Sequence, residues 1–202
     1  MDMKPTSDFS GVPTTSCGCS AVGVSEPQWF IAIVKNNTEL SVRDKLQKRG
    51  IESYVPTQIK LTVSPSGRKK DKVQVVIPSI IFINCSEEQR KEIVGLPYIH
   101  RFMINNSGTP DKFNRRPLAV VPNDQIEKLK FMVGNTDESV EFRPLDVKLG
   151  NTVEIVRGGL KGLIGNVENT DNATWFLIRI DTLGYARVKI DPVNLRTINI
   201  KE

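Results

Sequence analysis

The spacing of glycines in the last third of the chain is the feature that most restricts its fold. Five glycines lie between Gly150 and Gly165, and the pair Gly158-Gly159 predicts a tight turn, with Gly162 and Gly165 three residues apart. Glycine is the residue that adopts a positive φ, or lets two backbones approach closely, at little steric cost. This stretch therefore predicts closely packed strands joined by sharp turns.

Apolar segments of strand length follow the same region to the end of the chain. Val153 and Ile155 alternate with polar residues, as a half-buried strand requires. Further strands are expected over residues 164–168, 175–180, 185–190 and 195–198, with turns at 169–172 and 183–184. Five short strands in about 50 residues predict a small all-β barrel, whose sheet edges are paired or short. We assign it to residues 150–202.

Residues 28–133 show a mixture of strand and helix patterns. Strands are expected at 29–34, 51–56, 80–83 and 98–104, and a basic hairpin with its turn at 64–67 between the second and the third. Helices are expected from Asn36 to Gly50, from the capping box Ser86–Gln89 to about Gly95, and from Asn123 to Val133. This order predicts an α+β fold, an α/β sandwich with one antiparallel sheet covered by helices.

Composition marks two further segments. Residues 1–27 are rich in Ser, Thr, Gly and Pro without periodicity, which predicts a disordered tail, and the polar residues 134–149 predict a linker. The chain carries 28 Lys and Arg against 23 Asp and Glu, a net charge of +5. By segment, residues 28–133 carry a net +8 and residues 150–202 a net +1. A nucleic-acid contact is therefore expected on the first domain and not on the barrel.

The composition also excludes classes of function. The only histidine is His100, and no P-loop, HExxH, GxSxG or paired CxxC motif is present, so we expect no enzyme, no metal and no cofactor. Cys17 and Cys19 form one close pair, for which two free thiols are the simpler interpretation. No apolar stretch is long enough to cross a membrane, and the N-terminus lacks a signal-peptide pattern. We expect a cytoplasmic monomer.

Several motifs resemble the NusG family of transcription elongation factors. They are Trp29-Phe30, Gly50-Ile51 with Tyr54-Val55-Pro56, Pro78 before the strand 80–83, Leu96-Pro97-Tyr98-Ile99, Val121 to Ile126, and the glycine pattern of a KOW motif. The resemblance covers about residues 28–198 and implies an N-terminal NGN domain, a linker and a C-terminal KOW barrel of the SH3-like type.

The chain departs from the family pattern at several points. The family's Phe-Pro-Gly-Tyr reads Ile77-Pro78-Ser79-Ile80 here, and residues 68–72 and 111–116 look specific to a subgroup. With the long tail, these changes resemble specialised paralogs, in particular the antiterminators of Bacteroides capsular polysaccharide operons.

The resemblance implies an apolar patch that docks on the clamp helices of RNA polymerase. Matched motif by motif, the RNA polymerase-binding candidates are Phe30, Ile33, Tyr54, Ile77, Pro78, Ile80 and Phe102. Adjacent residues of a strand face opposite sides of a sheet, so they cannot all belong to one surface. For each residue, simple core packing remains the alternative interpretation.

Basic residues form a second set of candidates. In related specialised factors the NGN domain touches the non-template DNA strand, and phosphate contacts need Lys or Arg. The nucleic-acid-binding candidates, for non-template DNA or nascent RNA, are Arg43, Lys45, Lys48, Arg49, Arg68, Lys69, Lys70 and Lys72. A solvated hairpin tip and a solvated helix face remain the alternatives.

The kind of partner expected for the barrel is implied by the family resemblance alone. Family KOW barrels engage protein partners, including a small ribosomal subunit protein or the Rho termination factor. The partner-binding candidates here are Leu160, Leu163 and Leu183, with barrel packing as the alternative. Leu183 stands where the housekeeping factor presents an aromatic residue, which weakens the expectation of Rho binding.

The leading interpretation is a transcription elongation and antitermination factor. It would bind RNA polymerase through the NGN domain, suppress pausing or termination, and regulate an operon for polysaccharide synthesis. The alternative is a ribosome-associated or RNA-binding KOW protein, which would sediment with ribosomes in the absence of polymerase.

Overall fold

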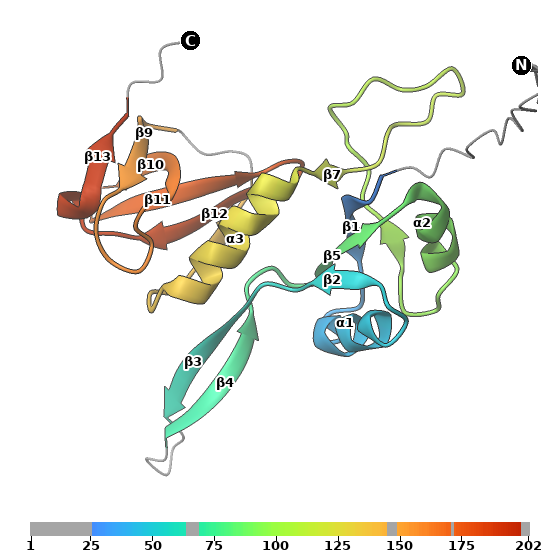
Figure 1. The fold of residues 1–202 in the computed structure, drawn as a ribbon, viewed down its shortest axis with the longest axis horizontal. Coiled ribbons are helices and arrows are strands. Elements are labelled where there is room, and N and C mark those ends of the chain that lie inside the picture. Colours follow the sequence, from blue (N-terminus) through green and yellow to red (C-terminus); the bar gives the residue numbers. More distant parts are fainter. Residues whose placement is uncertain (1–25, 64–68, 145–148, 171, 199–202) are drawn as a thin grey trace, which may run out of the picture.

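The computed structural model describes residues 26–63, 69–144, 149–170 and 172–198. It contains two sheets, a separate two-stranded ribbon and three α-helices, arranged as two neighbouring units (Figure 1). Most of the expected tail, including Cys17 and Cys19, lies outside the described residues, as do Arg68 and the expected hairpin turn at 64–67.

The N-terminal sheet is antiparallel and has five strands. They are β1 (Gln28–Ile33), β2 (Glu52–Tyr54), β5 (Ile80–Cys85), β6 (Arg101–Phe102) and β7 (Val120–Val121). The order is β2-β5-β1-β6, and β7 also pairs with β1. β1 and β5 match along their whole length, from Gln28 opposite Cys85 to Ile33 opposite Ile80. The sheet is therefore built around the two most apolar segments of the domain.

Side-chain alternation divides this sheet into two apolar faces. One face packs against α1 (Glu39–Gln47) and α2 (Glu87–Val94), which bury Leu46 and Ile93 there. The other face packs against α3 (Asn123–Asn135), which buries Ile126, Leu129 and Met132. The expected α/β sandwich with an antiparallel sheet is confirmed.

Local sequence signals predicted the start of α2 and the end of α1, but not the start of α1. The Ser86 hydroxyl accepts the N–H of Gln89, and the Gln89 side chain accepts the N–H of Ser86, so the expected capping box starts α2. Gly50 follows α1 with φ 74°, the left-handed conformation expected of it. α1 begins three residues later than Asn36, because Asn37 has φ 64° and interrupts the helical path.

The second expected strand, 51–56, is shorter than expected. β2 ends at Tyr54, and β3 (Thr57–Val63) leaves the sheet to pair with β4 (Lys69–Val75) as a separate ribbon. This ribbon projects from the domain (Figure 1). The expected basic hairpin is therefore present. The expected strand 98–104 is shorter, since β6 spans only Arg101–Phe102.

The C-terminal β-domain has the five expected strands. They are β9 (Thr152–Ile155), β10 (Ile164–Thr170), β11 (Ala173–Ile180), β12 (Gly184–Lys189) and β13 (Leu195–Thr197), which follows a 3-10 turn at Pro192–Asn194. Gly165 allows two strands to meet, because a Cβ there would lie 2.3 Å from the carbonyl oxygen of Leu177. A sixth strand, β8 (Glu141–Arg143), comes from the expected linker and pairs with β12.

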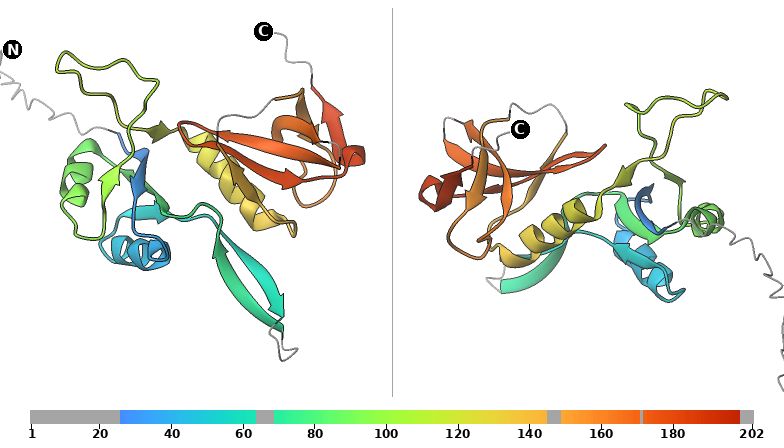
Figure 2. Two further views of the ribbon diagram at one scale, coloured as in Figure 1. Left: turned by 180° about the vertical axis from the view of Figure 1, so that it is seen from behind. Right: turned by 45° about the horizontal axis from the view of Figure 1, so that its top comes forward.

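Helix α3 lies between the N-terminal sheet and the C-terminal β-domain (Figure 2). One apolar cluster is continuous across it, from Ile31 and Phe82 in the sheet, through Leu129, to Phe176 and Ile178 in β11. The two units therefore share a core in this structure. None of the described helices is long and apolar enough to cross a membrane.

Candidate functional site

Sheet register sorts five of the seven apolar candidates onto two surfaces. Ile33 lies opposite Ile80, and Tyr54 lies opposite Phe82 with the two rings stacked at 6.2 Å. These side chains belong to the face that packs on α3. Phe30 and Phe102 lie on the opposite face, both buried, with their rings in edge contact at 5.9 Å. In this conformation they pack within the domain.

Ile77 and Pro78 lie in the segment that leads into β5. Ile77 is buried and Pro78 is exposed, and Ser79 follows with φ 62°. The Ser79 N–H donates to the Glu39 carboxylate at 2.7 Å, and the Ser79 carbonyl accepts the N–H of Val34 at 3.0 Å. These bonds hold a non-glycine residue in a left-handed conformation that glycine would adopt without strain. The segment is thus fixed with Pro78 outward.

Glu39 is a structural residue that sequence reasoning did not select. It is only 2% exposed although it stands in the first turn of α1. Its partner is a backbone N–H forty residues away, so only the fold reveals the contact. The signal that could have pointed to it is the serine at the family's glycine position.

Lys130 of α3 covers the aromatic part of the same face. Its Nζ lies 4.7 Å from the centre of the Trp29 ring and 5.5 Å from that of Tyr54. Burial raises the pKa of Tyr54 above its usual value, so the phenol stays neutral. Tyr54 therefore offers an apolar ring with a neutral hydroxyl.

The C-terminal β-domain is attached at both ends of α3. At the start, the Gln125 amide donates to the Asp181 carboxylate at 2.9 Å, and the Asp181 N–H donates back to the Gln125 Oε1 at 2.8 Å. At the end, Gly159 packs so closely that a Cβ there would lie 2.3 Å from the carbonyl oxygen of Asn135. Thr182, beside the first contact, shares a pocket with Ile33.

The three leucine candidates lie at or in this shared core. Leu160 and Leu163 are each 7% exposed, and Leu183 is partly buried against the same cluster. None of them is a freely exposed side chain in this conformation.

The basic candidates divide into two separate groups. On α1, Arg43 pairs with Asp44 at 2.8 Å, and Lys45 lies 5.1 Å from the Tyr98 ring centre. Lys48 and Arg49 directly follow the helix and are exposed. On the ribbon, Lys69, Lys70 and Lys72 belong to β4. The structure adds Lys60, which stands directly opposite Lys72, with both side chains exposed.

Two facing lysines repel each other, so the pair favours an anion between or beside them. Lys60 and Lys72 line a groove of about 590 Å³ together with Asn36 and Asn37, at the opposite end of α1 from Lys48. The ribbon and the C-terminal end of α1 therefore form two basic surfaces. Sequence reasoning missed Lys60 because the pairing depends on the hairpin register.

Groups suited to catalysis are not gathered anywhere in the described ranges. No cluster of three metal-ligating side chains occurs among these residues, and His100 is exposed. Burial raises the pKa of the Cys85 thiol to about 11, so it is no nucleophile at neutral pH.

The sequence of this chain matches the model of a known protein family. The family model "Transcription termination factor nusG" matches residues 27–130, about half of the chain. A solved structure described as "Domain interaction in Thermotoga maritima NusG" is 15% identical with a TM-score of 0.44, over 86% of this chain and 98% of that one. No curated protein matches. On the strength of the family match, the chain belongs to the NusG family, a family of non-enzymatic transcription factors that bind RNA polymerase.

Proposed function

We propose that this protein is a transcription elongation and antitermination factor that binds the clamp helices of RNA polymerase through its NGN domain. The binding surface is the edge of the α3-facing sheet face, where Ile33 and Tyr54 are half-buried and pack on the buried Ile77 and Ile80. Pro78, which is exposed and follows Ile77, borders this surface on the side of the Lys60–Lys72 groove. Family membership supports the general partner. The proposal rests mainly on one observation, the apolar side chains that the register brings together on that face.

The contact with the C-terminal β-domain bears on how this surface is used. Thr182 lines a pocket with Ile33, and Leu183 packs against the same apolar cluster. A helical partner that docks at Ile33 therefore competes with the β-domain for apolar surface. We expect binding to loosen the contact between the domains and to free Leu160, Leu163 and Leu183 for a second protein.

The ribbon supplies the nucleic-acid contact in this proposal. The Lys60–Lys72 pair and the remaining basic residues of 68–72 would contact phosphates of the non-template DNA strand. The resemblance to specialised paralogs supports action on one operon for polysaccharide synthesis. A ribosome-associated role remains the alternative function.

Direct binding to purified core RNA polymerase tests the proposal. We expect Tyr54→Ala and Pro78→Glu each to weaken binding about tenfold or more, because each removes apolar contact at the surface. Val193→Glu is the matched control, since Val193 is 70% exposed and lies on the β-domain. Circular dichroism verifies that each variant is folded.

Unchanged affinity in both folded variants would refute the surface. Absence of polymerase binding at low salt, with co-sedimentation of the protein with ribosomes, would replace the proposal by its alternative.

A further inference from the structure

The loop between β6 and β7 projects from the NGN domain, and its two arms are hydrogen-bonded to each other at the base. The Asn105 N–H donates to the Pro117 carbonyl at 2.9 Å, and Ile104 forms a β-bridge with Leu118. Gly108 packs on the ring of Pro117, where a Cβ would lie 2.3 Å from Cγ. The two arms thus continue the strand pairing of a sheet whose central strand is β1. They give the loop a defined base (Figure 1).

The tip of the loop is organised by one carboxylate. The Asp111 Oδ1 accepts the N–H groups of Phe113 and Arg115, both at 2.8 Å. The Asp111 N–H donates to the Arg115 carbonyl at 2.8 Å, and Asn114 has φ 58°. These bonds occupy Asp111 with the backbone and hold the residues of the tip in one turn.

This turn presents an exposed aromatic ring between cations. Phe113 is 65% exposed. The Lys112 Nζ lies 5.6 Å from its ring centre, and the Arg115 Cζ lies 5.1 Å from it. Arg116 follows, and its Nη1 donates to the carbonyl of Asn106 at 2.5 Å. Among the described residues, none of these three cations forms an ion pair with a carboxylate.

We propose that the tip, residues 111–116, is a binding site for single-stranded nucleic acid, with a base stacked on Phe113 and phosphates held by Lys112 and Arg115. Stacking on an exposed aromatic ring beside cations is the chemistry by which proteins bind single strands without reading the sequence. A duplex keeps its bases stacked inside and gains only the phosphate contacts. The two cations, at 5.1 and 5.6 Å from the centre of the Phe113 ring, add attraction for phosphates, which a nucleic-acid strand supplies along its whole length.

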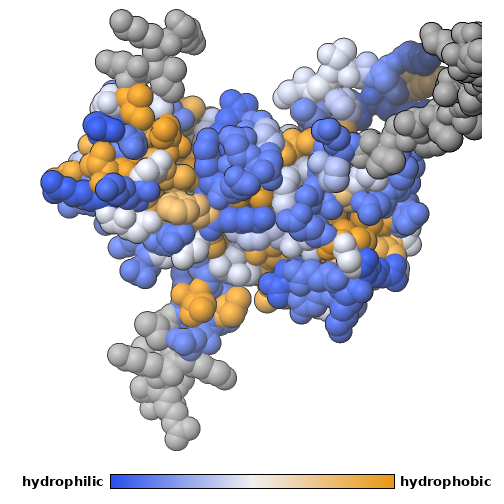
Figure 3. Space-filling model, viewed as in Figure 1, coloured by the Kyte–Doolittle hydropathy of each residue, from blue (hydrophilic) through white to orange (hydrophobic). Residues whose placement is uncertain are grey.

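The site is separate from the surfaces proposed above. The loop and the β3–β4 ribbon project from opposite ends of the NGN domain (Figures 1 and 2). In the space-filling view, the loop carries mainly hydrophilic surface (Figure 3). Oligonucleotide binding at this loop goes beyond the proposed function and can be measured in the absence of polymerase.

Fluorescence anisotropy with the full chain and labelled oligonucleotides of about 12 nucleotides tests the site. The probes are single-stranded RNA, single-stranded DNA and a DNA duplex. We expect the chain to bind single strands more tightly than the duplex, and the RNA and DNA arms to show which strand is preferred. Phe113→Ala should weaken single-strand binding about fivefold or more, whereas Phe113→Trp should retain it.

Phe131→Ala is the matched control, because Phe131 is also an exposed phenylalanine, at 40%, and lies on α3. It should bind as the unsubstituted chain does, and equal thermal unfolding would show that the loop variants are folded. Equal affinity of Phe113→Ala and the unsubstituted chain overturns the proposal, as does an absence of single-strand binding. A Phe113→Ala chain that loses polymerase binding but keeps oligonucleotide binding overturns it too, in favour of a protein contact.

Discussion

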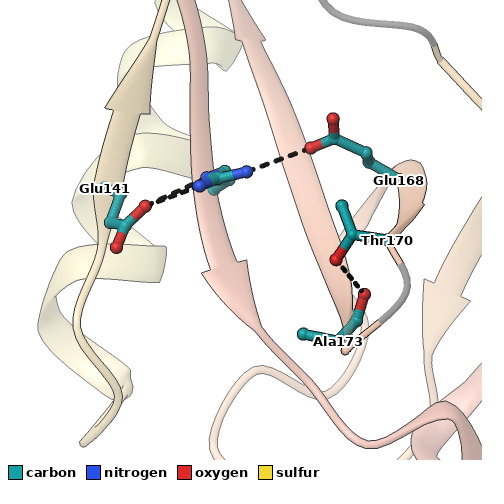
Figure 4. Close-up of polar contacts among 5 residues, drawn as sticks. Glu141, Glu168, Thr170 and Ala173 are labelled. Atoms are coloured by element: carbon teal, nitrogen blue, oxygen red, sulfur yellow. Dashed lines mark hydrogen bonds and ion pairs between the residues drawn. The ribbon is translucent and has the colours of Figure 1, made fainter.

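Arg187 shows how one residue joins the linker to the C-terminal β-domain. Its side chain is 8% exposed, and it donates to Glu141 of β8 at 2.8 and 3.1 Å and to Glu168 of β10 at 3.2 Å (Figure 4). The guanidinium carbon also lies 4.0 Å from the centre of the Trp175 ring. A buried charge is tolerated only when such partners satisfy it. Arg187 therefore holds β8 at the edge of the sheet.

We predict that Arg187→Lys lowers the free energy of unfolding by about 2 kcal/mol, because an ammonium cannot bond both carboxylates and stack on the ring. Urea unfolding measures the effect. Arg196→Lys is the control: Arg196 pairs with Glu154 but is 68% exposed, so its loss should stay within about 0.5 kcal/mol. Equal stability of Arg187→Lys and the unsubstituted chain would contradict the assigned role.

Cys85 gives a pH-dependent prediction at the same scale. Burial raises the pKa of its thiol from 9.0 to about 11, so the folded state holds this proton more tightly than the unfolded state. This contribution to stability is fully present below pH 9 and is lost as the pH rises toward 11. Between pH 8 and about 11, the free energy of unfolding should therefore fall less in the Cys85→Ala variant than in the unsubstituted chain. Identical pH dependence in the two chains would contradict the shift.

At the scale of elements, local signals predicted those parts whose partners are near in sequence. The capping box at Ser86, the positive φ of Gly50 and the two arms of the hairpin depend on neighbours within a few residues. β7 and β8 were not predicted, because each is only two or three residues long and pairs with a distant strand. Such short segments carry no periodic pattern.

The segment after α3 shows the same limit. The Gln58 side-chain amide on β3 donates to the Glu138 carbonyl at 3.0 Å, and its oxygen accepts the N–H of Val140 at 2.8 Å. With β8 paired to β12, much of the expected linker is bound along its length in this conformation. A polar segment has the same composition whether its backbone groups bond to water or to a side chain distant in sequence. Composition alone therefore could not predict these contacts.

Gly159 tests the contact between the domains. Gly159→Ala would place a Cβ 2.3 Å from the Asn135 carbonyl oxygen, so the β-domain must move away from the end of α3. We predict a larger radius of gyration by small-angle X-ray scattering, with the circular dichroism spectrum unchanged. The matched control is Gly134→Ala on the same helix end, where a Cβ meets nothing within 4 Å. Equal radii for both variants would contradict the close contact.

At the scale of the whole molecule, the sequence predicted the distribution of charge but not the contact between the two units. The excess of positive charge over residues 28–133 follows from counting, and the ribbon confirms one exposed part of it in Lys60 and Lys72. The shared core could not be predicted, since Leu129 or Phe176 is equally apolar whether it packs within one domain or between two. Alternation along the expected strand 29–34 separates Phe30 from Ile33, but only the fold shows that Ile33 lies on the face that packs on α3.

We predict that the ribbon contributes more than the C-terminal end of α1 to the salt dependence of binding to elongation complexes. For a chain bound to elongation complexes, the double variant Lys60→Gln/Lys72→Gln should weaken binding and flatten its dependence on salt by about 1.4 in the log–log slope. The control Lys48→Gln/Arg49→Gln changes as many charges at the other end of α1. An unchanged slope in the Lys60/Lys72 variant across the titration would refute the assignment of the ribbon.

The proposed elongation and antitermination role is tested by single-round transcription with purified RNA polymerase, on a template with a pause site and a terminator. We predict that the protein shortens the pause and increases readthrough, and that Tyr54→Ala and Pro78→Glu lose both effects while Val193→Glu keeps them. Pause lifetimes and readthrough that stay unchanged at saturating protein, with polymerase shown to be bound, would contradict it.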